Sequence, residues 1–462
     1  MHKVGSRWLV AVALVVAVAT GVTVVVWMNR STPATEENSA GYGRFRVSAR
    51  LDSTPVPQWT LRASDLSAEA GAVLLAAPQG LGRYYGYGAP MDGGTMIVAA
   101  TAVPTPPQPG ETSGQNIGPV RLHGLDPGTG QVRWTTEVGE LDGCTEQLFD
   151  GKLACRGARR VLVVEVVTGA ILADQATDFE VTDVALWDGV VSVTGRTPDW
   201  MTAVVTRGTL ADIAATWRQT YPTPVPGDPV TPRISTRDYF LDGHDHAVRL
   251  YDLRTGDPLF TAPIVTTFEG GLIAEQENIW RPDRVRFLDR GGNPVGEVGN
   301  PSYIFDWYPT VTAAMPPILT GAGAYDRSTG RPLWTNDRIS VDDSTGRTPA
   351  IEGIVGDTVI VRTRDYTELI ALDLTDGHQI WRRPTPFANP SRYSRLDGVA
   401  DSRHLILTDG AVVHAIDVSD GSTTWSMPLP PSGRPNFFTA VKALGGRLVT
   451  TTAQEFTGYA AG

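Results

Sequence analysis

Leu372-Asp373-Leu374-Thr375-Asp376-Gly377-His378-Gln379-Ile380-Trp381 contains the motif from which the fold of this 462-residue chain can be predicted. A strand-like run ends at an Asp, and the Asp is followed by Thr or Asp three residues later, Gly four residues later and an aromatic residue eight residues later. A weaker copy has only Glu165 and Gly169. Four further copies contain Asp126, Gly130 and Trp134; Asp252, Gly256 and Phe260; Asp326, Gly330 and Trp334; and Asp417, Gly421 and Trp425.

Each part of this frame has a physical role in a β-hairpin. The Asp carboxylate accepts hydrogen bonds from backbone N–H groups of the turn that follows it. The Gly adopts the positive φ that a tight connection requires. A Trp at the same place in successive copies lies between neighbouring sheets and buries about 150–250 Å² there. We therefore expect each copy to be a hairpin that offers a large ring to its neighbour.

The copies recur about every 40 residues, which is the length of one four-stranded propeller blade. Two wider gaps each hold a degenerate copy, one leading from Thr209 to Trp217 and one around Asp289. The eight copies predict an all-β fold, a β-propeller of four-stranded blades, with eight as the expected number and seven to nine as the range. Within residues 56–462 the ring is expected to close where the strand around Trp59 completes the C-terminal blade.

The copies that end at Trp334, Trp381 and Trp425 resemble the tryptophan-docking repeat of the quinoprotein family. WD-type propellers would instead place Trp directly beside Asp. The resemblance implies one of two functions. The dehydrogenases of this family hold pyrroloquinoline quinone and calcium and oxidise alcohols or sugars. Non-enzymatic members, such as the propeller lipoprotein of the outer-membrane β-barrel assembly machinery, bind partner proteins.

Among these two kinds of member, the chain is more similar to the binding proteins. Many of the dehydrogenases stack their cofactor against a disulfide of adjacent cysteines, whereas the two cysteines here are Cys144 and Cys155. The sequence also has no Cys-x-x-Cys-His segment to accept electrons. We therefore expect no cofactor, and a quinone-dependent dehydrogenase is the alternative. A lipid anchor is not expected, because the first cysteine is Cys144.

The N-terminus carries a segment typical of a membrane anchor. Residues 8–28 are uncharged and long enough to span a bilayer as one helix. Lys3 and Arg7 precede this run, so the positive-inside rule places residues 1–7 in the cytoplasm and the rest outside. A cleaved signal peptide ending near Ala19 is the alternative, although the apolar run continues past that point. The prediction is a single-pass protein of the cell membrane, with an extracytoplasmic linker at residues 29–55.

The net charge limits the classes of molecule that the propeller can bind, and the cysteines bear on the cellular compartment in which it folds. The net charge of −11 argues against nucleic acid or an anionic lipid surface as the partner of the propeller. Cys144 and Cys155 flank a turn signal at Asp150 and Gly151. Outside the cytoplasm they are expected to form a structural disulfide, with two free buried thiols as the alternative.

Candidate chemistry is sparse. His244 and His246 form the only His-rich cluster, and without a third distant ligand we interpret it as a surface turn and predict no metal site. The Asp residues of the repeat recur too regularly to be general acids or bases, and no catalytic motif is present, so no catalytic residue is predicted. Two proline-rich excursions, residues 104–118 and 221–232, are expected to be long loops, where binding often resides.

These observations predict a non-enzymatic protein-interaction scaffold of the bacterial cell envelope. The membrane would be engaged through residues 8–28, and the propeller would bind an envelope protein. A ligand-sensing domain is a third possibility, weakened because residues 1–7 leave no room for a cytoplasmic output.

Overall fold

The computed structural model of the chain describes the following residues: 42–75, 91–92, 94–105, 116–145, 148–222, 232–244, 247–276, 284–299, 308–320, 323–336, 349–387, 396–430, 440–452 and 455–462. The chain divides into two compact units, one of Met1–Tyr42 with Thr312–Pro316 and one of Gly43–Val311 with Pro317–Gly462. Among the described residues no helix has the length and apolar character needed to cross a membrane. The anchor predicted at residues 8–28 lies outside them.

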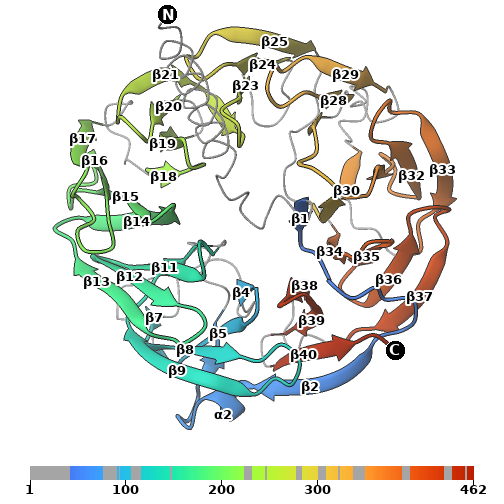
Figure 1. The fold of residues 1–462 in the computed structure, drawn as a ribbon, viewed down its shortest axis with the longest axis horizontal. Helices are drawn as coiled ribbons and strands as arrows, with labels where there is room; N and C mark the ends of the chain where they lie inside the picture. The colour runs from blue at the N-terminus through green and yellow to red at the C-terminus, as the bar shows by residue number, and fades with distance from the viewer. Residues whose placement is uncertain are drawn as a thin grey trace, which may run out of the picture. The chain divides into compact units, whose positions relative to one another are not determined.

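The second unit is a β-propeller. Over the described residues nine of its ten sheets are arranged as blades around a central axis, and we number these blades along the chain (Figure 1). The strands of each blade are given from the centre of the ring outward. Blade 1 contains β3 (Val73–Leu74), β5 (Ile97–Ala102), β8 (Val120–Leu125) and β9 (Val132–Gly139), with β4 (Met91–Asp92) beside β5. Blade 2 contains β10 (Gly143–Cys144), β11 (Lys152–Gly157), β12 (Arg160–Glu165) and β13 (Ile171–Ala176). Blade 3 contains β14 (Glu180–Trp187), β15 (Val190–Arg196), β16 (Thr202–Gly208) and β17 (Trp217–Pro222).

The next three blades continue the ring. Blade 4 contains β18 (Arg233–Ile234), β19 (Tyr239–His244), β20 (Ala247–Asp252) and β21 (Pro258–Ala262). Blade 5 contains β22 (Ile264–Thr267), β23 (Ile273–Gln276), β24 (Arg284–Leu288) and β25 (Pro294–Gly299). Blade 6 has three strands among the described residues, β27 (Ile318–Thr320), β28 (Gly323–Tyr325) and β29 (Pro332–Thr335).

The last three blades bring the chain back to its start. Blade 7 contains β30 (Ala350–Val355), β31 (Thr358–Arg362), β32 (Glu368–Asp373) and β33 (Gln379–Pro384), and its sheet also includes β26 (Thr310–Thr312) and β1 (Tyr42–Arg44). Blade 8 contains β34 (Asp397–Ala400), β35 (His404–Thr408), β36 (Val412–Asp417) and β37 (Thr423–Pro428). Blade 9 contains β38 (Ala440–Leu444), β39 (Arg447–Thr451), β40 (Glu455–Ala460) and β2 (Val56–Arg62). Three short elements complete the description: α2 (Ala63–Leu66) after β2, and the hairpin β6 (Pro104–Thr105) with β7 (Asn116–Ile117).

The expected number of eight blades is one too low, although nine lies within the predicted range. Each of the eight copies of the repeat falls in a blade of its own, from blade 1 to blade 8. Blade 9 was missed because its outermost strand, β2, comes from the other end of the chain and pairs antiparallel with β40. There is consequently no turn between its third and fourth strands, and no Asp–Gly signal to count.

The Asp of the repeat builds the turn between the third and fourth strands of a blade. In blade 6, Asp326 Oδ1 accepts the backbone N–H groups of Ser328 at 3.0 Å and Thr329 at 2.8 Å. Hydroxyl hydrogen bonds from Ser328 and then Thr329 are the main reasons why the pKa of Asp326 falls to about 2, so the carboxylate stays ionised. The turn ends at Gly330, whose φ is +65°.

The Trp of the repeat joins each blade to the next. Trp381 lies on β33, the outermost strand of blade 7, and its indole N–H donates to the carbonyl of Val418 in blade 8 at 2.8 Å. Its ring also covers Gly421, where a Cβ atom would come within 2.7 Å of the ring. Glycine is therefore required at position 421 for two reasons. Its φ of +75° is strained for other residues, and the Trp381 ring leaves no room for a Cβ atom.

Five further tryptophans donate the same kind of hydrogen bond, four of them to the following blade and one, Trp425, to a segment outside the blades. The pairs are Trp59 with Pro127, Trp134 with Val166, Trp217 with Arg254, Trp334 with Leu374, and Trp425 with Leu51. Where the position is not Trp, the seam is held differently. Blade 2 has Ala173 there, and the Gln175 amide instead donates to the carbonyl of Leu210 and accepts from the N–H of Ile213.

A segment that precedes β2 completes the contact between blades 8 and 9. Residues 45–53, here called the strap, cross from Ala400 to the outer strand of blade 8. Leu51 is 2% exposed, and its carbonyl accepts the indole N–H of Trp425 at 2.7 Å, the role that a turn residue plays in the other blades. The Leu51 N–H donates to the buried carboxylate of Asp401 at 2.8 Å. The strap thus supplies the acceptor that blade 9 lacks.

The connections between strands lie at two ends of the blades, because successive strands are antiparallel. Turns from first to second and third to fourth strands lie at one end, which we call the turn face. Connections from second to third strands and from blade to blade lie at the other, which we call the loop face. The strap lies on the turn face, where it contacts the first-to-second turns at Asp401 and Gly446. Both proline-rich excursions belong to the loop face; the structure describes their ends, and residues 106–115 and 223–231 lie outside the described residues.

Replacing Trp381 tests how much each part of the seam contributes. Trp381→Phe keeps a ring over Gly421 but removes the hydrogen bond to Val418, so the free energy of unfolding should fall by about 1–2 kcal/mol. Trp381→Ala also empties the space of the ring and should lower it by about 3–5 kcal/mol. Urea unfolding of the full chain measures both. Val167→Ala, at a side chain that is 59% exposed, is the control and should stay within about 0.5 kcal/mol. Equal losses for Phe and Ala would show that the ring does not contribute.

The buried His123 should make stability depend on pH. It bridges Thr101 and Thr135 inside blade 1, with ring nitrogen to hydroxyl distances of 2.8 and 3.0 Å, and burial followed by the charge of Arg121 lowers its pKa to about 4. An unfolded His has a pKa of about 6.5, so between these values the unfolded chain binds the additional proton and is favoured.

We therefore expect the contribution of His123 to be complete above pH 6.5 and to disappear as the pH falls to about 4, a change of up to about 3 kcal/mol. Urea unfolding at several pH values in this window, compared with His123→Gln, isolates this effect from other titrating groups. Parallel pH curves for the two proteins would contradict the assignment.

Candidate functional site

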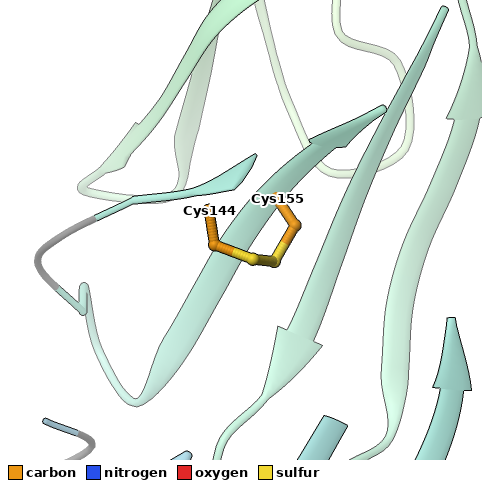
Figure 2. Close-up of a disulfide and its surroundings, with 2 residues drawn as sticks. All are labelled: Cys144 and Cys155. Atoms are coloured by element: carbon orange, nitrogen blue, oxygen red, sulfur yellow. A yellow bond between two sulfur atoms is a disulfide. The ribbon is translucent and has the colours of Figure 1, made fainter. Parts of the chain in front are cut away.

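The residues that the sequence singles out do not meet at one place. The Asp, Gly and Trp positions of the repeat lie in the turns and seams around the ring, where their hydrogen bonds are made within the propeller. Cys144 and Cys155 are paired across β10 and β11 of blade 2, and a disulfide joins them (Figure 2). Both lie in the core, with Cys155 fully buried, so this bond is structural. The cluster around His246 lies outside the described residues, apart from the backbone of His244.

One group of side chains has the composition of a metal site but belongs to a turn. Asp373, Asp376 and His378 offer ligand atoms within 4.8 Å of one another on the turn face of blade 7. Asp373 already accepts the N–H of Thr375 at 2.7 Å, and Asp376 accepts the N–H of His378 at 3.0 Å. The Asp376 carboxylate, as acceptor of a hydrogen bond from the His378 ring, raises the pKa of this exposed histidine. The turn accounts for this arrangement, and it is not the candidate site.

A cavity of about 260 Å³ lies where the ring closes. It is lined by the strap, through Val47 and Leu51, and by Gly446, Arg447 and Tyr459 of blade 9. The backbone of Ser48 donates to Gly446 at 2.7 Å beside it, so the cavity is part of the seat of the strap.

The candidate site is a tight turn on the loop face of blade 3. Between β15 and β16, Arg196 and Trp200 lie at the two sides of this turn, and the guanidinium carbon of Arg196 lies 3.7 Å from the indole centroid. Arg196 Nε also donates to the Glu180 carboxylate on β14 at 3.0 Å. Trp200 is 45% exposed, and it is the only tryptophan among the large hydrophobic side chains exposed in the described part of the chain.

The backbone of this turn has a conformation that residues other than glycine rarely adopt. Trp200 has a φ of +65°, which is strained for a bulky residue. Three hydrogen bonds fix it: the Trp200 N–H donates to the carbonyl of Thr197 at 2.9 Å, and Asp199 Oδ1 accepts the Thr197 hydroxyl at 2.5 Å and the Met201 N–H at 3.1 Å. The Thr and Asp of the turn thus fix the backbone that carries the exposed ring.

Blade 7 contains the same turn, with its arginine buried. Arg362-Thr363-Arg364-Asp365-Tyr366 repeats the pattern Arg-Thr-x-Asp-aromatic of Arg196 to Trp200. Tyr366 has a φ of +62°, Asp365 Oδ1 accepts the Thr363 hydroxyl at 2.7 Å, and the guanidinium carbon of Arg362 lies 4.8 Å from the Tyr366 ring. The acidic partner is also present, since Arg362 Nε lies 2.7 Å from Glu352 on the innermost strand.

The two turns differ in burial. The side chains of Arg362 and Glu352 are 2% and 0% exposed, whereas those of Arg196 and Glu180 are 21% and 33% exposed. In blade 7 the Arg362–Glu352 ion pair is part of the core. In blade 3 the Arg196–Glu180 ion pair is partly exposed, and the Trp200 ring beside it is in contact with solvent. Sequence analysis missed both turns because it weighed only the Asp–Gly–Trp frame. The shared pattern Arg-Thr-x-Asp-aromatic is the signal that would have found them.

Comparison with known proteins supports the repeat. Residues 320–403, from blade 6 to blade 8, match the family model described as outer membrane protein assembly factor BamB. This confirms the predicted resemblance to the quinoprotein-type repeat family. A comparison with curated proteins finds no match.

Similar solved structures include an outer-membrane assembly protein and two dehydrogenases. BamB from Moraxella catarrhalis is 14% identical, with 67% of this chain and 91% of that chain covered and a TM-score of 0.38. A europium-containing methanol dehydrogenase is 12% identical, with 88% and 86% covered and a TM-score of 0.42. The quinohemoprotein alcohol dehydrogenase ADHIIG from Pseudomonas putida HK5 is 11% identical, with 90% and 78% covered and a TM-score of 0.40. With TM-scores below 0.5, these likenesses carry no argument about function.

The equivalent turns of blades 3 and 7 should lose different amounts of stability when their arginine is replaced. Arg362→Met leaves the Glu352 carboxylate buried without its cation and should lower the free energy of unfolding by about 3–5 kcal/mol. Arg196→Met, in the exposed turn, should lower it by about 1 kcal/mol or less. The double variant Glu352→Gln with Arg362→Met should recover part of the loss. Urea unfolding measures all three, and similar losses for the two single variants would contradict the assigned difference in environment.

Proposed function

We propose that this chain is a non-enzymatic protein-interaction scaffold, anchored in the cell membrane by residues 8–28 with its propeller on the extracytoplasmic side. The observation that carries the proposal is the contrast between the two faces of the ring. On the turn face the carboxylates of the repeat accept hydrogen bonds from their own turns. On the loop face, blade 3 holds an exposed indole in a fixed position.

Binding sites for proteins commonly contain such an anchor. Aromatic residues and arginine are enriched at the centres of protein interfaces, where a few side chains carry most of the binding energy. A rigid scaffold with a projecting Trp and Arg on one face has this composition. The matched family model is described as an assembly factor, and this description agrees with a scaffold role in an envelope complex.

The anchor and the compartment are supported by the sequence. An uncharged run of sufficient length precedes the propeller, and Lys3 and Arg7 lie before it. A disulfide between Cys144 and Cys155 agrees with an oxidising compartment outside the cytoplasm. The alternative of a quinone-dependent dehydrogenase rests on family resemblance alone.

In-cell crosslinking of the tagged full-length chain, followed by mass spectrometry of the membrane fraction, tests the proposal. We expect one or two envelope proteins to be recovered in amounts close to that of the chain, with crosslinks on the loop face. Recovery of the chain without any partner would overturn the scaffold function. In that case, calcium-dependent dye reduction by the purified chain with added pyrroloquinoline quinone would support the enzyme alternative.

A further inference from the structure

We propose that the turn from Arg196 to Met201 is the point at which a partner protein docks, and that the partner segment places an apolar ring on Trp200 and a basic side chain beside Asp199. The inference rests on the proposed scaffold function and identifies its contact site.

The strain of the turn is the first argument. A bulky residue at positive φ is destabilised by about 1–2 kcal/mol, and such positions persist where the surrounding structure over-determines them, often at functional sites. Tyr366, in the equivalent turn of blade 7, has a similar φ, but its ring is only partly exposed and lies against an arginine that is 2% exposed. Trp200 has the same strain with 45% of its surface exposed. A bound partner would cover the exposed part of the Trp200 ring and so offset this strain.

The position of the Arg196 guanidinium indicates which kind of side chain can bind to the other face of the Trp200 ring. This cation lies 3.7 Å from the indole centroid and takes up one face of the ring. The field of a cation on one face makes the other face a poorer site for a second cation, since both would draw on the same ring quadrupole. Proline, tyrosine or another apolar ring is therefore favoured over lysine at that face, where stacking and burial supply the energy.

The basic side chain is inferred from Asp199. The hydrogen bond from the Thr197 hydroxyl, followed by that from the Met201 N–H, lowers the pKa of this exposed carboxyl group, so it stays ionised at neutral pH. Both of these bonds go to Oδ1, and the Asp199 side chain is exposed to solvent. The net charge of −11 adds long-range attraction for a basic partner.

Trp200→Gly is the most informative variant. Glycine adopts positive φ without strain, so this change removes the ring while keeping the turn. Asp199→Asn keeps an Oδ1 acceptor for Thr197 and Met201 and removes only the charge. Val167→Ala, at an exposed position on the turn face of blade 2, is the matched control. The melting temperature of each full-length variant should stay at or above that of the natural chain, within the error of the measurement.

Site-specific photo-crosslinking tests the inference in cells. A benzoylphenylalanine in place of Met201 in the full-length chain is irradiated, and the crosslinked peptide is sequenced by mass spectrometry; the same probe in place of Val167 is the control. We expect position 201, but not 167, to crosslink one envelope protein, through a segment with an aromatic or proline residue near a Lys or Arg. Trp200→Gly should lower the yield at least ten-fold, and Asp199→Asn about three-fold, with a weaker dependence on salt.

The outcomes separate this inference from the function on which it rests. If general crosslinking recovers a partner but Trp200→Gly changes its yield less than two-fold, the docking site is wrong and the scaffold function stands. A crosslinked segment that is acidic or lacks a ring would also overturn the inference. If no partner is recovered by either method, the scaffold function itself fails.

Discussion

The structure depends on one repeated interaction, the docking of an indole ring onto the turn of the following blade. The ring of Trp381 covers Gly421, and its N–H donates to the carbonyl of Val418, so a single side chain satisfies a backbone acceptor and fills a seam. The constraint acts on three positions at once. The turn needs its Asp to fix the N–H groups and its Gly to adopt positive φ and leave room for the ring, and the preceding blade needs its Trp to supply that ring. This coupling explains why the three residues recur together.

A closed ring must satisfy this interaction at the last seam as well, and the chain does so with a segment that has no repeat motif. Blade 9 takes its outermost strand from residues 56–62, so it has no turn to receive Trp425. The strap brings Leu51 to that position, and Asp401 holds Leu51 by its N–H. Ring closure therefore relies on two contacts from the same end of the chain: β2 beside β40, and Leu51 under Trp425.

The fold could be predicted from sequence because each residue of the repeat acts locally. Asp, Gly and Trp lie within nine positions of one another, and their spacing survives even where a copy is weak. The ninth blade and the strap could not be predicted in the same way. Their contacts join residues such as Leu51 and Asp401, which are 350 positions apart, and neither residue belongs to a pattern. The turn at Trp200 carried a usable signal, the shared Arg-Thr-x-Asp-aromatic pattern, but its exposure could not be inferred from that pattern.

The two copies of that turn show how environment decides what a motif does. Arg362 and Glu352 are removed from water, so their ion pair must be complete, and breaking it would leave a buried charge. Arg196 and Glu180 have the same geometry in contact with solvent, where an ion pair contributes little to stability. Stability therefore constrains the turn of blade 7 strongly and the turn of blade 3 weakly. A strained, exposed tryptophan in a turn that contributes little to stability is better explained by what it contacts outside the propeller than by what it contacts within it.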